Sequence, residues 1–296
     1  MALSQTQIAH FKTFGFLILR DYFSKNEVAT IWEEYKHRCS VAESYIPFDG
    51  TRCHSMNMMG ADTPFFRSLL DDRDWFLGIA KQLVGKVLGV GVAVTRHNTN
   101  TYWHYDSTTY ELPSIGFACY LHPVRADTGA LRVIPGSHLK PFHDEIGIIE
   151  ACDYAWIRQN NQEEACAMVD SIPAFVCETD PRDVVVFDHR IYHATVGGSN
   201  DRPRMGAGYR LYPRTPRETA GMSWESKDIF QEQNNSESPW EPKFTYPREW
   251  INDPAGPPVR KEWMAEYQRF SEMDAKETGF QTIVRDGKLW IEPVEA

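Results

Sequence analysis

Two kinds of hydrophobic spacing divide the chain. Up to about residue 90, apolar side chains recur at helical intervals, and two capping-box motifs, Ser4-x-x-Gln7 and Ser24-x-x-Glu27, precede such runs. Residues 41–64 contain Pro and Gly but no helical spacing, so this segment is predicted to be irregular. Besides a helix from each motif, the predicted elements are a buried strand at 16–19 and helices at 64–70 and 74–83.

Beyond residue 90, the apolar residues come in short runs typical of β-strands. Turn signals such as Asp127-Thr128-Gly129 separate these runs. Many short strands with such breaks indicate a β-sandwich or a jelly roll, that is, an all-β core supported by helices. The stretch 139–172 is long, polar and acidic, and we expect it to form an insertion over one end of the barrel. The predicted strands are residues 91–95, 114–121, 130–134, 174–178, 183–187 and 205–212.

The C-terminal part of the chain differs from this core. A helix is predicted at 259–272, and a hairpin with an Asp-Gly turn is predicted at 281–291. The residues after 215 are predicted to pack on the same domain or to form a homodimer contact. The predicted organisation is one domain at 1–215, with a helical part at 1–90 and a jelly-roll core at 91–215, followed by an extension at 216–296.

Charge and composition exclude several classes of partner. The 296 residues carry a formal net charge of −10 and contain no Lys/Arg-rich run, which disfavours nucleic acid and anionic membranes as partners. No apolar stretch reaches the ~18–20 residues that span a bilayer, and the N-terminus lacks the pattern of a signal peptide. The six cysteines are spread singly, as in proteins of a reducing compartment. We therefore expect a soluble, cytoplasmic protein.

His104-Tyr105-Asp106 and the distant His193 are the candidate chemical centre. Two imidazoles and one carboxylate on one face of a metal leave the opposite face open, which is the ligand set of non-haem Fe(II) oxygenases. His104 and Asp106 are two residues apart, so an extended backbone places both side chains on one face. His193 is predicted to lie in a loop after the strand at 183–187. A His-x-Asp triplet alone is common by chance, so the prediction depends on the surrounding residues.

Arg204, eleven residues beyond His193, is the candidate anchor for a cosubstrate. The planar guanidinium group of arginine binds a carboxylate through two parallel hydrogen bonds. A metal with three protein ligands and a carboxylate anchor one strand away indicates 2-oxoglutarate, with O2 as the second cosubstrate. The keto-acid end would bind Fe(II), and the distal carboxylate would pair with Arg204. An isolated arginine is more often a surface ion-pair partner, which is how we interpret Arg202.

These residues belong to a longer pattern, which runs over most of residues 4–212. It includes the Ser-x-x-Gln-Ile helix start, the Trp-His-Tyr-Asp segment at 103–106, and the segment 127–138 with its Pro-Gly-Ser-His end. It also includes the Asp-Val-Val-x-Phe run before the second histidine and the arginine after it. The pattern resembles the phytanoyl-CoA dioxygenase family of Fe(II)/2-oxoglutarate-dependent oxygenases. The resemblance implies a double-stranded β-helix core, with His104, Asp106 and His193 on iron and Arg204 on 2-oxoglutarate.

The chain departs from the family pattern at three positions. Thr128 stands where the family usually has Asn, Arg182 where it has Gly, and Thr101 where a Gln is frequent. Thr101 and Thr128 are therefore candidates for further cosubstrate contacts. Related halogenases have a small residue at the position of Asp106, so the carboxylate indicates hydroxylation; desaturation, epoxidation or cyclisation by the same cofactor chemistry stays open. The histidines outside the triad, including His138, are interpreted as structural.

The predicted substrate is a small or medium-sized metabolite, with secondary metabolism favoured. No basic cluster suited to the phosphates of CoA lies near the motifs. The candidate pocket walls are Met58, Tyr102, Tyr105 and Tyr110. Two rival interpretations are a non-catalytic jelly-roll protein that binds a ligand without turnover, and a metal-dependent cupin enzyme that needs no arginine at position 204.

Overall fold

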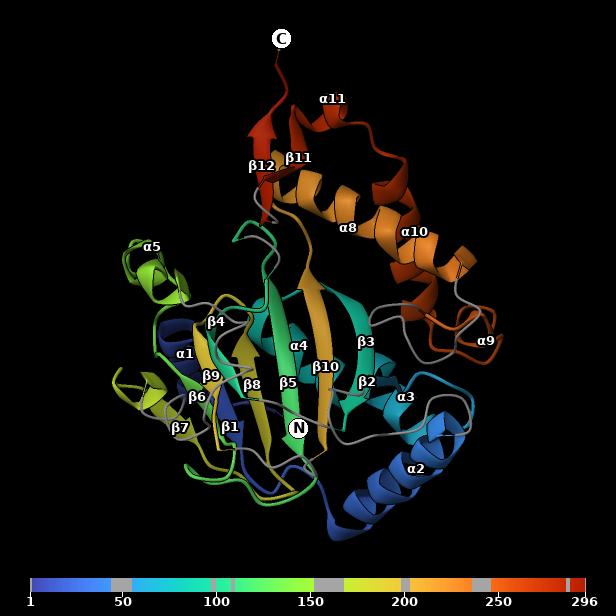
Figure 1. Ribbon diagram of the computed structural model, residues 1–296. Helices are drawn as coiled ribbons and strands as arrows, with labels where there is room; N and C mark the ends of the chain where they lie inside the picture. Colours follow the sequence, from blue (N-terminus) through green and yellow to red (C-terminus); the bar gives the residue numbers. More distant parts are fainter. Residues whose placement is uncertain are drawn as a thin grey trace.

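The core of the molecule is a pair of antiparallel sheets that face each other (Figure 1). The computed structural model describes residues 2–43, 55–96, 100–107, 110–151, 168–197, 203–235, 246–285 and 288–295. Eight successive strands of these residues, β3 to β10, are divided between the two sheets. The larger sheet has the strand order β1-β8-β5-β10-β3-β2, and the smaller sheet has the order β4-β9-β6-β7. This arrangement is a double-stranded β-helix, so the predicted fold class is confirmed.

Every strand predicted from the sequence overlaps an observed strand. Short strands that were not predicted include β9 and β2, of which β2 is an edge strand inside the segment predicted to be irregular. Residues 44–54 of that segment lie outside the described residues. The observed strands are β1 (Phe16–Leu19), β2 (Ser55–Asn57), β3 (Val87–Thr95), β4 (Thr101–His104), β5 (Ser114–Tyr120), β6 (Leu131–Val133), β7 (Phe175–Cys177), β8 (Val184–Asp188), β9 (His193–Thr195) and β10 (Arg204–Leu211).

Helices cover the outer face of the larger sheet, as the helical spacing predicts. Ser4 and Ser24 each form the predicted capping box, in which the serine and the residue three positions later bond each other's backbone N–H. The ring of Phe76 stacks on Phe117 of β5 with 4.5 Å between centroids. The helices are α1 (Gln5–Phe14), α2 (Lys25–Glu43), α3 (Pro64–Asp71) and α4 (Phe76–Val84).

The two faces of β10 have opposite characters. Side chains alternate along a strand, and Met205, Ala207 and Tyr209 point to the helices, where they belong to the main hydrophobic core. The residues between them face the smaller sheet. Arg204 shows this, because its cross-strand partner Tyr120 points to the same side and belongs to a cluster with residues of β6. This inner face consists of small residues over much of its length, which leaves room inside the barrel.

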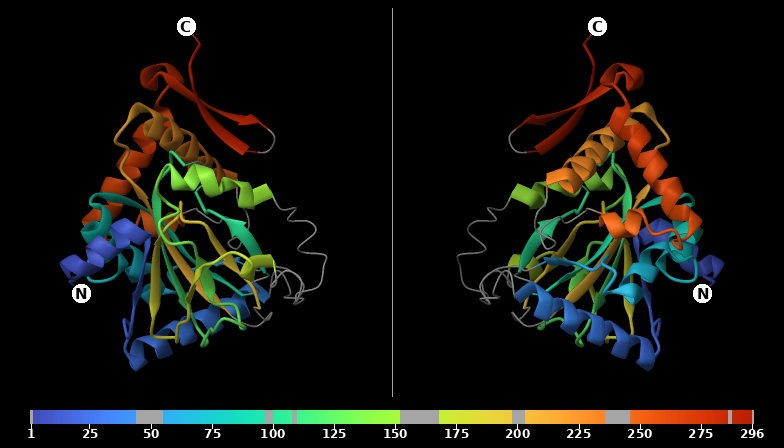
Figure 2. Two further views of the ribbon diagram at one scale, coloured as in Figure 1. Left: turned by 90° about the vertical axis from the view of Figure 1, so that its left-hand side faces the viewer. Right: turned by 90° about the vertical axis from the view of Figure 1, so that its right-hand side faces the viewer.

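The C-terminal extension packs on one end of the barrel (Figures 1 and 2). Trp263 donates its indole N–H to the carbonyl of Val87 at 2.9 Å, and Tyr267 donates to the carbonyl of Gly89 at 2.8 Å. The predicted helix and hairpin are confirmed, although the Asp-Gly turn lies outside the described residues. No helix was predicted at α8, which Thr215 caps through its hydroxyl. The elements are α8 (Pro216–Asn235), α9 (Arg248–Ile251), α10 (Pro258–Glu272), α11 (Ala275–Thr278), β11 (Phe280–Arg285) and β12 (Lys288–Pro293).

The predicted insertion at 139–172 begins with α5 (Phe142–Ile146) and a short 3-10 helix (Gly147–Ala151), which lie beside the smaller sheet. Residues 152–167 lie outside the described residues. Among the helices that the structure describes, none combines the length and the apolar character required to cross a membrane.

Candidate metal centre

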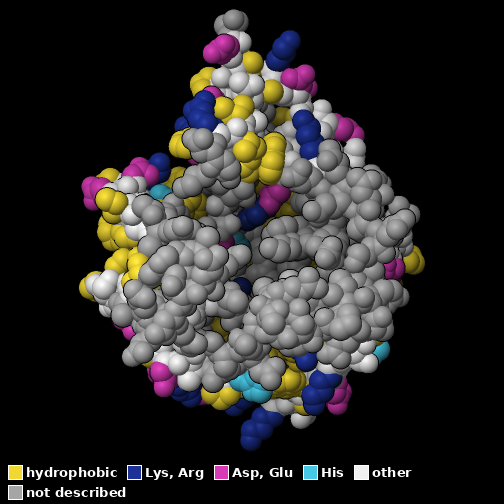
Figure 3. Space-filling view, viewed as in Figure 1, with side chains coloured by type: hydrophobic (Ala, Val, Ile, Leu, Met, Phe, Trp, Pro, Cys, Tyr) yellow, Lys and Arg dark blue, Asp and Glu magenta, His cyan; other side chains and the backbone are white. Residues whose placement is uncertain are grey.

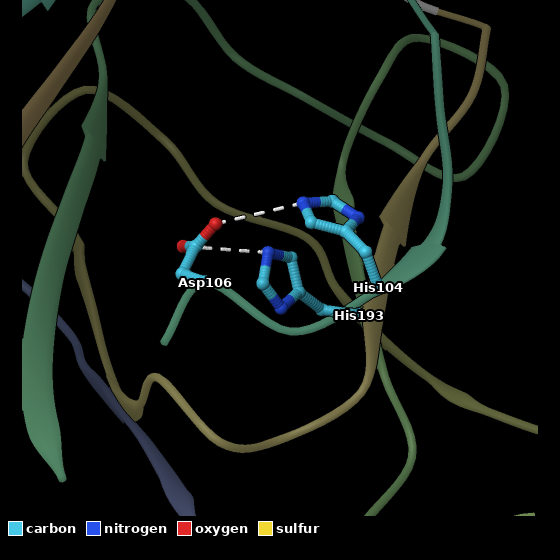
Figure 4. A group of neighbouring side chains, drawn as sticks. All are labelled: His104, Asp106 and His193. Atoms are coloured by element: carbon cyan, nitrogen blue, oxygen red, sulfur yellow. Dashed lines mark ion pairs between the residues drawn. The ribbon is translucent and has the colours of Figure 1, made fainter. Parts of the chain in front are cut away.

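Three side chains from two neighbouring strands converge at the mouth of the barrel (Figure 4). β4 and β9 are antiparallel neighbours, and His104 lies directly opposite His193 in their register. The carboxylate of Asp106, just after β4, lies 3.5 Å from Nε2 of each histidine. The three candidate ligand atoms all lie within 4.8 Å of one another. His193 begins β9, whereas the sequence analysis expected it in a loop, because the strand is only three residues long.

Hydrogen bonds to the backbone orient both imidazoles toward the carboxylate. Nδ1 of His104 lies 2.7 Å from the carbonyl of Tyr102, and Nδ1 of His193 lies 3.0 Å from the carbonyl of Ile191. A carbonyl oxygen only accepts, so each Nδ1 must carry a proton, and Nε2 is the ring nitrogen that faces Asp106. Second hydrogen bonds of this kind orient metal-binding histidines. Each Nε2 can therefore carry a proton toward the carboxylate or, without that proton, bind a metal ion.

Backbone contacts with the turn after β8 hold Asp106 in position. The carbonyl of His189 accepts hydrogen bonds from the backbone N–H of Asp106 at 2.8 Å and of Ser107 at 3.2 Å. The Asp106 side chain is 40% exposed although it lies inside the barrel mouth, whereas His193 is 3% exposed. Figure 3 shows a hollow on this face, with histidine and acidic side chains in its depth. The carboxylate therefore faces an opening that a substrate can enter.

For His104 and Asp106, interactions within the site outweigh the effect of burial on the pKa. Burial lowers the pKa of His104, but the hydrogen bond and the charge of Asp106 raise it above its usual value. Burial raises the pKa of Asp106, but the charge of His193 and the hydrogen bonds with both histidines lower it well below the usual range. A divalent cation would replace the protons that balance the carboxylate. The donor set of two imidazoles and one carboxylate therefore fits Fe(II).

Arg204 lies on the inner face of β10, next to a buried hydroxyl of the neighbouring strand β5. Its charge lowers the pKa of His104, which places it near the metal-binding residues. Across the β5–β10 register it is paired with Tyr120, whose buried hydroxyl has no hydrogen bond of ordinary geometry. Arg204 and Thr195 lie close enough to that hydroxyl to lower its pKa, although burial leaves the pKa raised. The guanidinium group of Arg204 and the hydroxyls of Tyr120 and Thr195 together fit the distal carboxylate of 2-oxoglutarate.

Thr195 and Tyr120 are the site residues that the sequence analysis missed. Thr195 follows His193 by two residues, so both side chains lie on one face of β9. That spacing is visible in the sequence and was the available signal for Thr195. Tyr120 comes to Arg204 only through strand pairing. Thr101, one of the predicted cosubstrate contacts, is paired with Thr195 across β4 and β9.

The other predicted contacts pack against residues outside the three candidate ligands. The hydroxyl of Thr128 accepts a hydrogen bond from the Arg125 N–H at 2.7 Å and closes a turn. Met58 is fully buried in the core between the larger sheet and its helices. Tyr102 belongs to a hydrophobic cluster outside the smaller sheet. Two more tyrosines pack around His143: Tyr105 lies 5.0 Å and Tyr110 4.6 Å from it between ring centroids.

His138 and His189, both interpreted as structural, have different surroundings. His138 is buried against Gly15, and its Nε2 lies 3.3 Å from the carbonyl of Lys12. His189 instead lies inside the barrel, where Nδ1 is 2.8 Å from the hydroxyl of Ser114. Burial lowers the pKa of His189 to about 4, against the opposite effect of Asp106. His189 is therefore a neutral ring next to the candidate metal centre.

Comparisons with solved structures find proteins of similar fold. The crystal structure of HygX from Streptomyces hygroscopicus, with nickel, 2-oxoglutarate and hygromycin B bound, aligns with a TM-score of 0.52 and 18% identity over 71% of this chain and 88% of that chain. The 2-oxoglutarate-dependent epimerase SnoN aligns with a TM-score of 0.52 and 17% identity, covering 70% and 82%. The corresponding values for the carbocyclase SnoK are 0.51, 19%, 71% and 84%. For EvdMO1 the TM-score is 0.49, and the chain covers 49% of that protein.

These structural likenesses show the fold, and a sequence match shows the family. No curated protein sequence matches the chain. The sequence model of the family described as phytanoyl-CoA dioxygenase (PhyH), however, matches residues 11–206, which is more than half of the chain and includes all three candidate ligands and Arg204. The chain therefore belongs to the phytanoyl-CoA dioxygenase (PhyH) family, whose members are non-haem Fe(II)/2-oxoglutarate-dependent oxygenases.

Proposed function

We propose that this protein hydroxylates a small or medium-sized metabolite, with conversion of 2-oxoglutarate and O2 to succinate and CO2. His104, Asp106 and His193 would hold Fe(II), and Arg204 would bind the distal carboxylate of 2-oxoglutarate. The observation that carries the proposal is the convergence of the three ligand atoms within 4.8 Å, with both histidines oriented by backbone carbonyls. Bound iron would activate O2 and couple the decarboxylation of 2-oxoglutarate to oxidation of a C–H bond.

The residues around the centre have separate tasks in this proposal. Arg204 binds and orients the cosubstrate through its planar guanidinium group. Tyr120 and Thr195 donate hydrogen bonds to the same carboxylate, which gives the buried Tyr120 hydroxyl the partner that it otherwise lacks. Phe187, whose ring centroid lies 5.3 Å from that of His193, excludes water from one side of the centre. Asp106 stands where related halogenases have a small residue, and its carboxylate would bind the metal in place of chloride, which supports oxygen transfer.

Related folds support other outcomes of the same cofactor chemistry. SnoN is described as an epimerase and SnoK as a carbocyclase, both dependent on α-ketoglutarate. The outcome depends on where the substrate lies relative to the metal. Hydroxylation is the outcome that requires no further residue to redirect the reaction, and we adopt it for this chain.

A spectroscopic experiment tests the cofactor assignment before any substrate is known. Purified protein with Fe(II) and 2-oxoglutarate, kept anaerobic, should develop a visible metal-to-ligand charge-transfer band. Replacement of His193 or Asp106 by Ala should remove the band and abolish succinate formation, whereas the exposed His37→Ala should retain both. Absence of the band in the unmodified protein would refute the proposal.

Substrate screening then separates the rival interpretations. A non-catalytic binding protein would release no succinate with any compound. A cupin enzyme that does not use 2-oxoglutarate would be indifferent to Arg204→Ala, whereas the proposed enzyme should need more 2-oxoglutarate. Succinate release that depends on a compound supplied from the screen would identify the substrate class.

A homodimer through residues 216–296 and a cytoplasmic location stay predictions. Within the extension, Trp250 and Trp263 are buried by their own chain, while Val284 and Trp290 of the hairpin are 66% and 48% exposed. Light scattering after size-exclusion chromatography, with Trp290→Ser as the variant, tests the homodimer. A monomer at all protein concentrations would contradict it.

A further inference from the structure

The inner face of β10 carries an arginine near each of its ends. Arg204 lies at the first residue of the strand, and Arg210 lies six residues later on the same face, about 20 Å away at the rise of a strand. Only glycines at 206 and 208 separate the two arginines along this face. Arg210 lies beyond the family match, which ends at residue 206, so the family pattern assigns it no role.

The C-terminal extension supplies the partner of Arg210. Nε of Arg210 lies 2.8 and 2.9 Å from the two carboxylate oxygens of Glu225 on α8, and Nη2 lies 2.6 Å from one of them. The side chains are only 6% and 13% exposed. A second contact of α8 lies nearby, where Arg217 pairs with Glu111 at 2.9 Å. The extension therefore forms part of the barrel end rather than a separate unit.

A short chain of contacts joins this ion pair to the candidate metal centre. Arg210 is paired across the β5–β10 register with Ser114, whose hydroxyl lies 2.8 Å from Nδ1 of His189 and 3.5 Å from the hydroxyl of Ser107. Ser107 directly follows Asp106. The charge of Asp106 also acts on both Arg210 and His189. The Arg210–Glu225 pair is therefore next to the metal-binding residues, at the opposite end of β10 from Arg204.

Glycines on β5 and β10 make room for the His189 ring on the inner face of the larger sheet. A Cβ atom at Gly116 would lie 2.1 Å from Nε2 of His189, and one at Gly208 would lie 3.8 Å from Cε1. In the part of the chain that the structure describes, neither Nε2 of His189 nor Nη1 of Arg210 has a hydrogen-bond partner. These two polar atoms can therefore each form a further hydrogen bond.

We propose that His189, Ser114 and the Arg210–Glu225 pair form a substrate subsite that selects neutral molecules with hydroxyl or carbonyl groups. Glu225 balances the charge of Arg210, so Nη1 offers a hydrogen bond without a net positive field. A carboxylate or phosphate at this position would meet the carboxylate of Glu225 as well as the guanidinium group, and like charges at such distances repel. The inference rests on the proposed function and narrows its substrate class.

The test removes the charge of Glu225 and keeps its size. In Glu225→Gln, Arg210 becomes an unbalanced cation, and the subsite should bind small anions. Acetate and acetamide are the probes, because they share one shape and differ in charge. In protein loaded anaerobically with Fe(II) and 2-oxoglutarate, acetate should perturb the charge-transfer band of the variant with an affinity at least about tenfold above that of the unmodified protein, the size of one charge-assisted hydrogen bond. Acetamide should show no such gain.

A second readout covers a variant that is too unstable to load. Acetate, but not acetamide, should raise the Tm of the metal-free Glu225→Gln protein, because it binds the folded state alone. Glu262→Gln is the matched control. Glu262 lies on α10 of the same extension and pairs with Lys86 at 2.8 Å, but both side chains are about half exposed. It should show neither effect. The double variant Arg210→Gln/Glu225→Gln should lose the acetate gain.

Two results would overturn the subsite. One is an equal affinity for acetate in the unmodified protein and in Glu225→Gln, with no selective rise in Tm. The other is an acetate gain that persists in the double variant, because the anion would then bind elsewhere. Absence of the charge-transfer band in the unmodified protein would instead refute the proposed function, so the two failures are distinguishable.

Discussion

Replacement of Tyr120 by Phe separates the cosubstrate role of this residue from its role in packing. The ring is buried between the sheets, and its hydroxyl has no hydrogen bond of ordinary geometry. Loss of the hydroxyl therefore removes no hydrogen bond of ordinary geometry and relieves a buried unpaired group, which costs about 1–3 kcal/mol. We expect Tyr120→Phe to be at least as stable as the unmodified protein.

Binding of 2-oxoglutarate should respond in the opposite direction. The hydroxyl lies beside Arg204, where it can donate to the distal carboxylate. A hydrogen bond to a charged group contributes about 1.5–3 kcal/mol, which corresponds to about 10- to 150-fold weaker binding when the donor is removed. An anaerobic titration of 2-oxoglutarate, followed at the charge-transfer band, measures this loss, and urea unfolding of the metal-free protein measures the stability.

Tyr209 provides a matched control on the other face of the same sheet. Its hydroxyl is also buried, but it donates to the carbonyl of Leu70 at 2.6 Å. Tyr209→Phe should therefore lose about 1 kcal/mol of stability and retain its affinity for 2-oxoglutarate. The reasoning is refuted if Tyr120→Phe binds 2-oxoglutarate as the unmodified protein does, or if it loses stability as Tyr209→Phe does.

Three further changes give distinct results. Arg204→Ala should raise the 2-oxoglutarate concentration that half-saturates the charge-transfer band by about 100-fold without loss of iron, measured by metal analysis; loss of iron would contradict the assigned role. Burial raises the pKa of Asp183, but backbone N–H groups and Arg20 lower it below its usual value; the ionised form therefore stabilises the fold above the usual aspartate pKa, and this contribution is lost as the pH falls through the lowered value. Asp183→Asn should cost about 2 kcal/mol at pH 7, and urea unfolding should show a smaller difference toward pH 3. In Gly89→Ala, the new Cβ would lie 2.4 Å from the Trp263 ring, so the Tm should fall by an amount equivalent to about 1–3 kcal/mol, while an unchanged Tm would show that the extension yields easily.

The elements that the sequence predicts are those whose signals are local. Short runs of apolar residues mark the buried strands, and a serine three residues before a Gln or Glu marks α1 and α2. The metal-binding residues were predicted because two of them belong to one triplet. α8 was missed although Thr215 and Glu218 carry the same kind of capping signal, with the Thr215 hydroxyl accepting a hydrogen bond from the Glu218 backbone N–H.

Contacts across strands were beyond prediction from one sequence. Tyr120 and Arg204 are 84 positions apart in the chain and become neighbours only through the β5–β10 register. A shift of one residue in that register would turn either side chain to the opposite face. Met58 illustrates the converse: its flexible side chain suggested a pocket wall, but its segment joins the outer core. The residue type determines the chemistry of a side chain, and the strand register determines on which face of the sheet that side chain lies.

The position of the two arginines on β10 explains why the family pattern predicts the cosubstrate but not the substrate. Arg204 lies inside the matched residues, where a common cosubstrate demands a common anchor. Arg210 follows on the same face but lies outside the match, and Glu225, which sets the charge around it, belongs to the extension. If the subsite forms as proposed, a change at Glu225 alters which molecule is accepted, while Arg204 continues to hold 2-oxoglutarate. Selectivity in this chain would then depend partly on residues 207–235, and a comparison confined to the matched domain would overlook that part.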